Sequence, residues 1–142
     1  MGNRKLVSRD ICPYFILLAE DHVVVRLWIR KMIEGNPNWQ VVGEVSDGVE
    51  LLKHLKECEN SPHLVILDIS MPRMGGLEVL PQLKAVYPDI KVLILTMHKS
   101  KEYFERAMAA GADGYLLKQH ADTDLPTAIS TVLQGGTYIS PL

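Results

Sequence analysis

Short runs of branched aliphatic residues alternate along this chain with longer amphipathic segments. The runs are "YFILLA" at 14–19, "VVGEV" at 41–45, "HLVIL" at 63–67, "KVLIL" at 91–95 and "GYLL" at 114–117. Runs of this length and composition are typical of strands buried on both faces. Helical periodicity is found between and after them, at 22–34, 48–59, 76–87, 100–110 and 122–134. The alternation therefore predicts five strand-helix units.

Strands that alternate with helices pair in parallel through right-handed crossovers. The predicted fold class is therefore α/β, a flavodoxin-like (βα)5 three-layer sandwich with a parallel sheet in the order 2-1-3-4-5. A chain of 142 residues that is 47% hydrophobic suits one domain of this kind. We expect an N-terminal arm at 1–12 and the folded domain over 13–136.

Composition excludes several other classes of protein. The net charge of −2 does not fit a strongly basic nucleic-acid-binding surface, and the apolar runs are too short to span a membrane. Cys12 and Cys58 form neither a CxxC pair nor a disulfide framework, and the first ten residues lack the apolar core of a secretory signal. We therefore expect a cytoplasmic protein with reduced thiols and no membrane partner.

Polar residues directly follow four of the five predicted strands. Glu20 and Asp21 follow the first strand, Asp68 the third, Thr96 the fourth and Lys118 the fifth. Each of them alone fits a helix cap or a solvated loop. Ligands on an open parallel sheet, however, bind at the carboxyl ends of the strands where the strand order reverses, here between the first and third strands. We therefore expect all five side chains to meet at one edge.

Three carboxylates close together repel one another unless one is protonated or a cation joins them. Oxygen ligands of this kind favour a magnesium-type ion. A divalent cation, a lysine and a hydroxyl beside a carboxylate suit phosphoryl transfer, with Asp68 as the nucleophile that forms an aspartyl phosphate. His22 and His98 lie near this edge, where a solvated position is more common for a histidine than a role as a metal ligand.

Four segments together resemble the receiver domain of two-component response regulators. They are "LLAEDH", "LVILDISMPRMGG", "VLILTMH" and "GADGYLLK", and the match runs from about residue 14 to 136. The resemblance implies that Asp68 accepts phosphate from a sensor histidine kinase. It also implies a Mg²⁺ site made by Asp21, Asp68 and the backbone carbonyl of Ser70, with Glu20 acting through water.

The same resemblance implies roles for the residues around the phosphate. Thr96 would bond the phosphoryl oxygen, Lys118 would pair with it, and Tyr115 would be the switch aromatic whose ring moves inward when Thr96 does. Ser70 and His98, two residues beyond the acceptor and the threonine, would tune dephosphorylation. Gln119 stands where many receivers have a proline, and a cis bond before a non-proline residue costs about 3 kcal/mol, so we expect a trans bond here.

The segments "EDHVVVR", "GADGYLLK" and "LQGGTYISPL" further resemble the NarL/FixJ subfamily. Its receivers usually precede a LuxR-type helix-turn-helix domain, so residues 137–142 would begin a linker to a C-terminal output domain that is absent from this chain. The implied function is a phosphorylation-controlled switch, acting in transcription through DNA contacts of that output domain. The implied homodimer uses the helices at 22–34 and 122–134, or the face of 100–110, 114–117 and 122–134.

Other functions remain open at this point. A stand-alone receiver would act by protein-protein contact alone. A haloacid dehalogenase-like phosphatase also forms an aspartyl phosphate, but it needs a second Asp two residues after the nucleophile, where this chain has Ser70. A flavodoxin-like cofactor binder would need a phosphate-binding loop after the first strand, and "EDHVVVR" would repel a phosphate in the absence of a metal ion. A receiver domain would be a regulatory phosphoacceptor that assists its own phosphorylation and dephosphorylation, not an enzyme.

The helix predicted at 22–34 has two apolar stripes. Helical spacing places one stripe toward the sheet, and it consists of Val25, Ile29, Met32 and Ile33. The other consists of Val24, Leu27 and Trp28, at i, i+3 and i+4, displaced toward solvent. Trp28 either folds over the edge of the core or, since tryptophan is enriched at interface hot spots, belongs to a partner surface.

Overall fold

The chain folds around one parallel sheet of six strands. In the computed structural model, which describes residues 13–141, the strand order is β2-β1-β3-β4-β5-β6. The expected arm at 1–12 and the last residue lie outside the described residues. The strands are β1 (Tyr14–Ala19), β2 (Trp39–Val45), β3 (Leu64–Leu67), β4 (Lys91–Thr96), β5 (Gly114–Leu117) and β6 (Tyr138–Ile139). The predicted flavodoxin-like order 2-1-3-4-5 is therefore confirmed.

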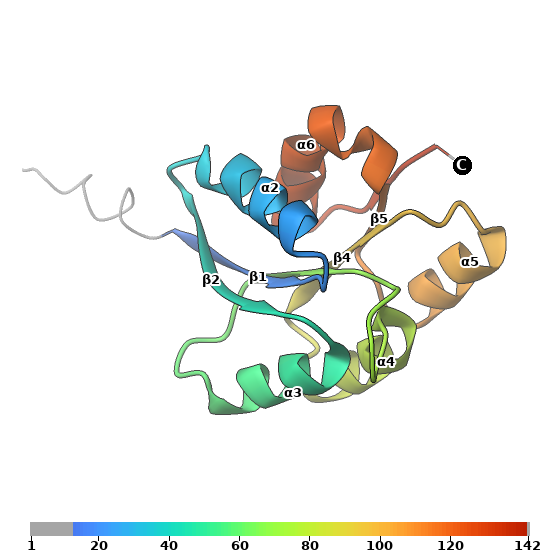
Figure 1. Cartoon of the computed structure of the whole chain (residues 1–142), viewed down its shortest axis with the longest axis horizontal. Coiled ribbons are helices and arrows are strands. Elements are labelled where there is room, and N and C mark those ends of the chain that lie inside the picture. Colours follow the sequence, from blue (N-terminus) through green and yellow to red (C-terminus); the bar gives the residue numbers. More distant parts are fainter. Residues whose placement is uncertain (1–12, 142) are drawn as a thin grey trace, which may run out of the picture.

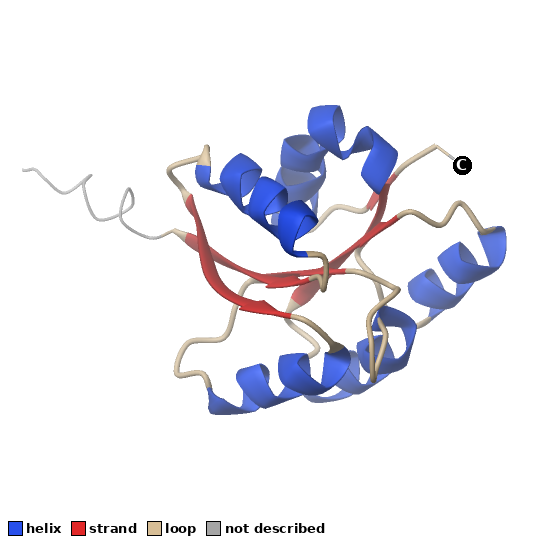
Figure 2. Cartoon of the chain, in the orientation of Figure 1, coloured by secondary structure: helices blue, strands red, loops and turns tan. Residues whose placement is uncertain are grey.

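Helices cover both faces of the sheet (Figures 1 and 2). They are α2 (Val23–Glu34), α3 (Gly48–Glu57), α4 (Gly76–Val86), α5 (Lys101–Ala109) and α6 (Ala121–Leu133), with a short 3₁₀ turn, η1 (Lys118–His120), before α6. Figure 1 shows α2 and α6 on one face and α3, α4 and α5 on the other. The helix boundaries lie within two residues of those predicted from the sequence.

Alternation of side chains along each strand divides the core between the two faces. In β3 all four residues are buried. Leu64 and Ile66 pack with residues of α2 and α6, whereas Val65 and Leu67 pack with residues of α3, α4 and α5. Successive residues of a strand point to opposite faces, so a strand covered by helices on both sides needs an apolar residue at every position. This explains the uninterrupted aliphatic run.

The register of the parallel strands sets the position of the polar residues that follow them. Ala19 pairs with Leu67, and Thr96 pairs with Leu117. The residues immediately beyond these pairs therefore begin their loops at the same edge of the sheet. The backbone N–H of Asp68 still donates to the carbonyl of Ala19 at 3.0 Å, which continues the pairing of β1 with β3 up to the acidic residue.

The sixth strand was not predicted from the sequence. β6 lies within 137–142, the segment expected to begin a linker, and it pairs in parallel with β5. Ser140 continues this attachment: its N–H donates to the carbonyl of Tyr115 at 2.8 Å and its hydroxyl accepts from the N–H of Leu117 at 3.1 Å. Two residues of a strand carry too little periodicity to be recognised in a sequence.

Candidate phosphorylation site

The carboxyl edge of the sheet brings three charged side chains into contact. Lys118 Nζ lies 2.8 Å from Glu20 Oε1 and 3.4 Å from Asp68 Oδ2. Glu20 and Asp68 are buried, and Lys118 is half-buried. One ammonium thus pairs with two buried carboxylates but balances only one of their two negative charges. The convergence predicted from strand order is confirmed for these residues.

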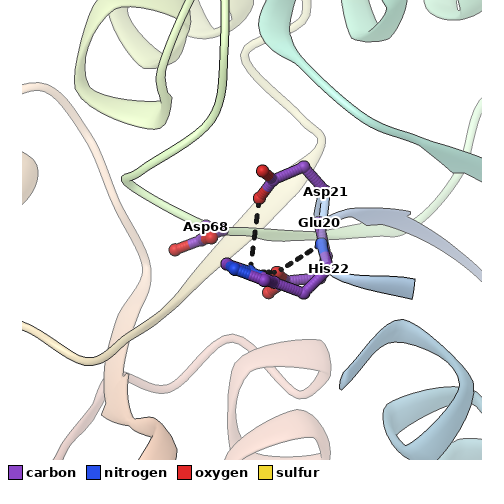
Figure 3. Close-up of side chains that lie close together, drawn as sticks. All are labelled: Glu20, Asp21, His22 and Asp68. Atoms are coloured by element: carbon purple, nitrogen blue, oxygen red, sulfur yellow. Dashed lines mark hydrogen bonds and ion pairs between the residues drawn. The ribbon is translucent and has the colours of Figure 1, made fainter. Parts of the chain in front are cut away.

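Asp21 and His22 complete an acidic cluster with Glu20 and Asp68. Each of the four residues offers one ligand atom, and these atoms all lie within 4.8 Å of one another. Figure 3 shows the His22 ring extending between the carboxylates toward Asp68. Among the described residues, Glu20 Oε1 and Asp21 Oδ1 are buried oxygens that accept no hydrogen bond, although Lys118 pairs with Glu20 Oε1 by charge. Such oxygens fit a hard divalent cation.

The environment of Asp68 raises the pKa of its carboxyl group from the ordinary value of 3.8 to about 6. Burial is the largest cause, and the negative charge of Glu20 acts in the same direction. Lys118 and the N–H of Ser70, which donates to Asp68 Oδ1 at 3.3 Å, lower it in part. Asp68 therefore remains largely ionised at neutral pH and can act as a nucleophile there.

Thr96 and Tyr115 meet at the backbone of His98. The N–H of His98 donates to Thr96 Oγ1 at 3.1 Å, and the hydroxyl of Tyr115 donates to the carbonyl of His98 at 2.9 Å. The Tyr115 ring is fully buried and lies edge-on to Phe104, with ring centroids 5.3 Å apart. In this structure the aromatic ring therefore lies inward, and the loop after β4 connects it with Thr96.

The side chain of His98 also joins the loops after β3 and β4. Its Nε2 lies 2.8 Å from Ser70 Oγ, and its ring lies edge-on to Tyr103 with centroids 4.9 Å apart. His98 is thus held on two sides, whereas the sequence favoured a solvated position. Because Ser70 and His98 come from segments 28 residues apart, no local sequence signal indicates that they meet.

Two glycines allow the loop after β3 to fold back onto the strand. A Cβ at Gly76 would lie 2.4 Å from the carbonyl oxygen of Asp68, and one at Gly75 would lie 2.6 Å from that of Ile69. Real Cβ atoms do not approach backbone so closely, so the start of α4 can reach the strand end only without side chains at these positions. The opposite side of this loop is held by Arg73, which pairs with the buried Asp47 at 2.8 Å.

Comparison with known families decides what kind of protein carries this site. The family model for the response regulator receiver domain matches residues 16–130. The chain belongs to the response regulator receiver domain family. Domains of this family are regulatory parts of two-component systems rather than classical enzymes, which agrees with the resemblance found in the sequence.

Relatives of this receiver domain support the NarL/FixJ-type subfamily. The chain is 39% identical over 125 residues to the oxygen regulatory protein NreC of Staphylococcus epidermidis. The aligned region covers 87% of this chain and 56% of NreC. It is also 39% identical over 126 residues to the response regulator GacA of Pseudomonas protegens, and that aligned region covers 89% of this chain and 58% of GacA. The chain thus spans about half the length of these curated relatives.

Solved structures of response regulators have the same fold as this chain. A two-component response regulator of the LuxR family from Aurantimonas sp. has a TM-score of 0.85 and 32% identity, with 91% of both chains covered. The isolated receiver domain of RcsB from Salmonella enterica serovar Typhimurium, in the presence of the phosphomimetic BeF3-, has a TM-score of 0.83 and 29% identity. That match covers 90% of this chain and 94% of the RcsB domain.

Two further features of this receiver domain bear on the sequence predictions. The described residues contain no cis peptide bond, so the bond between Lys118 and Gln119 is trans. Within residues 13–141, no helix is long and apolar enough to cross a membrane.

The first helix of the receiver domain presents apolar side chains to solvent. In α2, Ile29 and Ile33 are buried against the sheet, as the first stripe predicts. Val24 is 80% exposed, Leu27 54% and Trp28 38%. Val23, which the sequence analysis did not include, is 66% exposed and extends the same surface toward the acidic cluster. These four residues are called the α2 patch below.

Proposed function

We propose that this domain is a phosphorylation-controlled signalling switch in which Asp68 accepts phosphate from a sensor histidine kinase. The observation that carries the proposal is the contact of Lys118 with both Asp68 and Glu20 at the carboxyl edge of the sheet. A carboxylate oxygen of Asp68 attacks phosphorus, an O–P bond forms, and the P–N bond to the donor histidine breaks. The Lys118 ammonium then pairs with the phosphoryl oxygens.

The cation of this site is proposed to be Mg²⁺, held by Asp21, Asp68 and the backbone carbonyl of Ser70, with Glu20 acting through water. When bound, the ion neutralises phosphoryl oxygens and the carboxylates around them. Asp21 and Asp68 would hold the ion directly and Glu20 through water, and Asp68 would retain one oxygen for attack. The buried Asp21 Oδ1, which accepts no hydrogen bond among the described residues, supports this assignment.

The phosphoryl group is proposed to act on Thr96 and Tyr115. Thr96 Oγ1 accepts a hydrogen bond from His98 N–H, and its hydroxyl proton is therefore available to a phosphoryl oxygen. A shift of Thr96 would change the loop that carries His98 and, through its carbonyl, Tyr115. The consequence is a rearrangement of the face made by α5, β5 and α6, which alters dimerisation or an output domain.

The wider assignment rests on the relatives. RcsB, a similar protein, has been solved as dimers bound to DNA. We propose that the receiver occupies 13–136 of this chain together with β6, which adds to its sheet, and that the chain beyond β6 leads toward a helix-turn-helix output domain. We also propose that the complete protein regulates transcription in the cytoplasm. DNA would be bound by the output domain alone. A receiver that acts only through protein-protein contact is the alternative.

The test is phosphate incorporation from acetyl phosphate in the presence of Mg²⁺, followed by mass spectrometry of the modified peptide. We expect one phosphate on Asp68, none in Asp68→Asn, and none after chelation of the divalent ion. A beryllofluoride adduct should form on the same carboxylate. Full labelling of Asp68→Asn, or labelling that survives chelation, would refute the proposal.

A further inference from the structure

The side chain of His22 lies inside the acidic cluster. Its Nδ1 lies 3.1 Å from Glu20 Oε2 and 3.5 Å from Asp21 Oδ1. One of its ring nitrogens lies within 4.8 Å of the ligand oxygens of Glu20, Asp21 and Asp68. In Figure 3 the ring occupies the space between these carboxylates. A cation that binds the oxygens of this cluster would therefore lie close to a ring nitrogen of His22.

The backbone holds His22 in this place. His22 is the residue before α2, with extended φ and ψ angles of −81° and 113°, and its N–H donates to Glu20 Oε2 at 3.1 Å. A residue at this position often caps the helix, but the His22 side chain makes no capping hydrogen bond in the described part of the chain. The imidazole is turned instead toward the carboxylates, while 66% of the side chain remains exposed to water.

Imidazole changes which ions such a cluster prefers. Carboxylate oxygens and water suit Mg²⁺, which retains much of its hydration, whereas imidazole nitrogen is a ligand of first-row transition metals. A histidine that bonds a carboxylate through one ring nitrogen has its tautomer fixed and offers the other nitrogen to a metal. The contact with Glu20 Oε2 provides that carboxylate.

We propose that His22 is a ligand of the cation site and that it makes the site bind a transition metal such as Mn²⁺ more tightly than carboxylates alone would. This inference rests on the proposed metal site and adds a nitrogen donor to it. His22 would then decide which divalent ion supports phosphorylation at a given composition of the medium. Replacing its imidazole should lower the affinity for Mn²⁺ about tenfold, and should change the affinity for Mg²⁺, an oxygen-seeking ion, less than about threefold.

The experiment compares the full chain with His22→Ala and His22→Phe. Phenylalanine keeps a ring in the space but has no nitrogen, so it separates ligation from simple obstruction. Affinities for Mn²⁺ and Mg²⁺ are measured by calorimetry, and pulsed electron paramagnetic resonance of the Mn²⁺ complex detects a directly bound imidazole nitrogen. We expect the nitrogen signal in the parent and its loss in both variants, together with the tenfold loss of Mn²⁺ affinity.

Each other outcome overturns the inference in a recognisable way. Absence of a nitrogen signal in the parent, or its persistence in both variants, means that His22 is not a ligand. Tighter binding of both ions by His22→Ala, but not by His22→Phe, means that the ring only obstructs the site. Asp68→Asn and Asp21→Asn control for the site itself: Mn²⁺ binding that ignores both substitutions would remove the proposed metal site, and this inference with it.

Discussion

Ser70 Oγ and His98 Nε2 form a 2.8 Å hydrogen bond that joins the loops following β3 and β4 beside Asp68. Ser70 is also the residue whose N–H donates to Asp68 Oδ1, so the bond connects His98 to Asp68, the proposed phosphoacceptor, through a single residue. An isolated hydrogen bond of this kind contributes about 1 kcal/mol. Because the bond lies beside Asp68, we expect it to affect the rate at which a phosphate on that residue is hydrolysed.

We predict that His98→Ala and Ser70→Ala each change the rate of dephosphorylation by about two- to tenfold, as expected for loss of about 1 kcal/mol. Because both variants break the same bond, the double variant should change the rate no more than the larger single effect. Release of phosphate from the loaded domain measures the rates, with His120→Ala as a control histidine. Additive effects, or unchanged hydrolysis in both single variants, would refute the role of the bond.

The raised pKa of Asp68 predicts how stability depends on pH. The pKa of Asp68 is about 6 in the folded protein and has the ordinary value of 3.8 in the unfolded chain. Between pH 3.8 and 6 the folded protein therefore binds this proton more tightly than the unfolded chain does. Stability from this group is therefore complete below about pH 4 and is lost as pH rises through 6. At pH 7.5, without divalent ions, Asp68→Asn should raise the free energy of unfolding by on the order of 2 kcal/mol. Urea unfolding at pH 4.5 and 7.5 checks this, and an advantage of Asn that does not grow with pH would contradict it.

The two neighbours of Asp68 should shift its pKa in opposite directions. Glu20 raises that pKa by charge repulsion and Lys118 lowers it by attraction. We therefore expect Glu20→Gln to bring the pKa of Asp68 below about 6 and Lys118→Met to bring it higher. Titration of the carbon-13 carboxyl signals by nuclear magnetic resonance, in chelator, measures both. The absence of both shifts would show that burial alone governs the group, and shifts of the same sign would contradict the opposing effects of the two neighbours.

Gly76 should tolerate no side chain. A methyl group there would lie 2.4 Å from the carbonyl oxygen of Asp68, and the backbone on both sides is fixed by the sheet and by α4. Gly76→Ala should destabilise the fold by about 1–3 kcal/mol and lower phosphorylation of Asp68. The matched control is Gly35→Ala. Its Cβ would lie 3.3 Å from the Met32 carbonyl oxygen, a much milder contact, and Gly35 already has a helical backbone conformation. Equal stability of the two variants would disprove the steric argument.

The α2 patch is predicted to bind a partner, either the kinase during phosphotransfer or a second copy of the chain. It begins directly after the acidic cluster, and tryptophan with aliphatic neighbours is typical of interface hot spots. Trp28→Ala and Leu27→Ser should weaken self-association or kinase-to-Asp68 transfer at least tenfold, by on the order of 2 kcal/mol. Val86→Ser, an exposed apolar position on α4, is the control. If folding by circular dichroism, self-association and kinase-to-Asp68 phosphotransfer all match the parent, the patch is only the partly exposed edge of the hydrophobic core.

Local patterns predicted much of this molecule because the physical causes are themselves local. Buried parallel strands need uninterrupted aliphatic runs, so the strands were recognisable. The alternation with helices predicted parallel pairing, for which 2-1-3-4-5 is the natural order of five units. Parallel pairing then placed Glu20, Asp68 and Lys118 at one edge without any knowledge of coordinates.

Only the tertiary structure decided which side chains touch within that edge. The bond between Ser70 and His98, the inward ring of Tyr115 and the place of His22 among the carboxylates depend on how loops from different strands pack. The pairing of β6 with β5 likewise depends on a partner strand distant in sequence. Sequence periodicity indicates which residues of a helix or strand are buried. The contacts named here depend instead on distances between different elements, and no local sequence pattern encodes those distances.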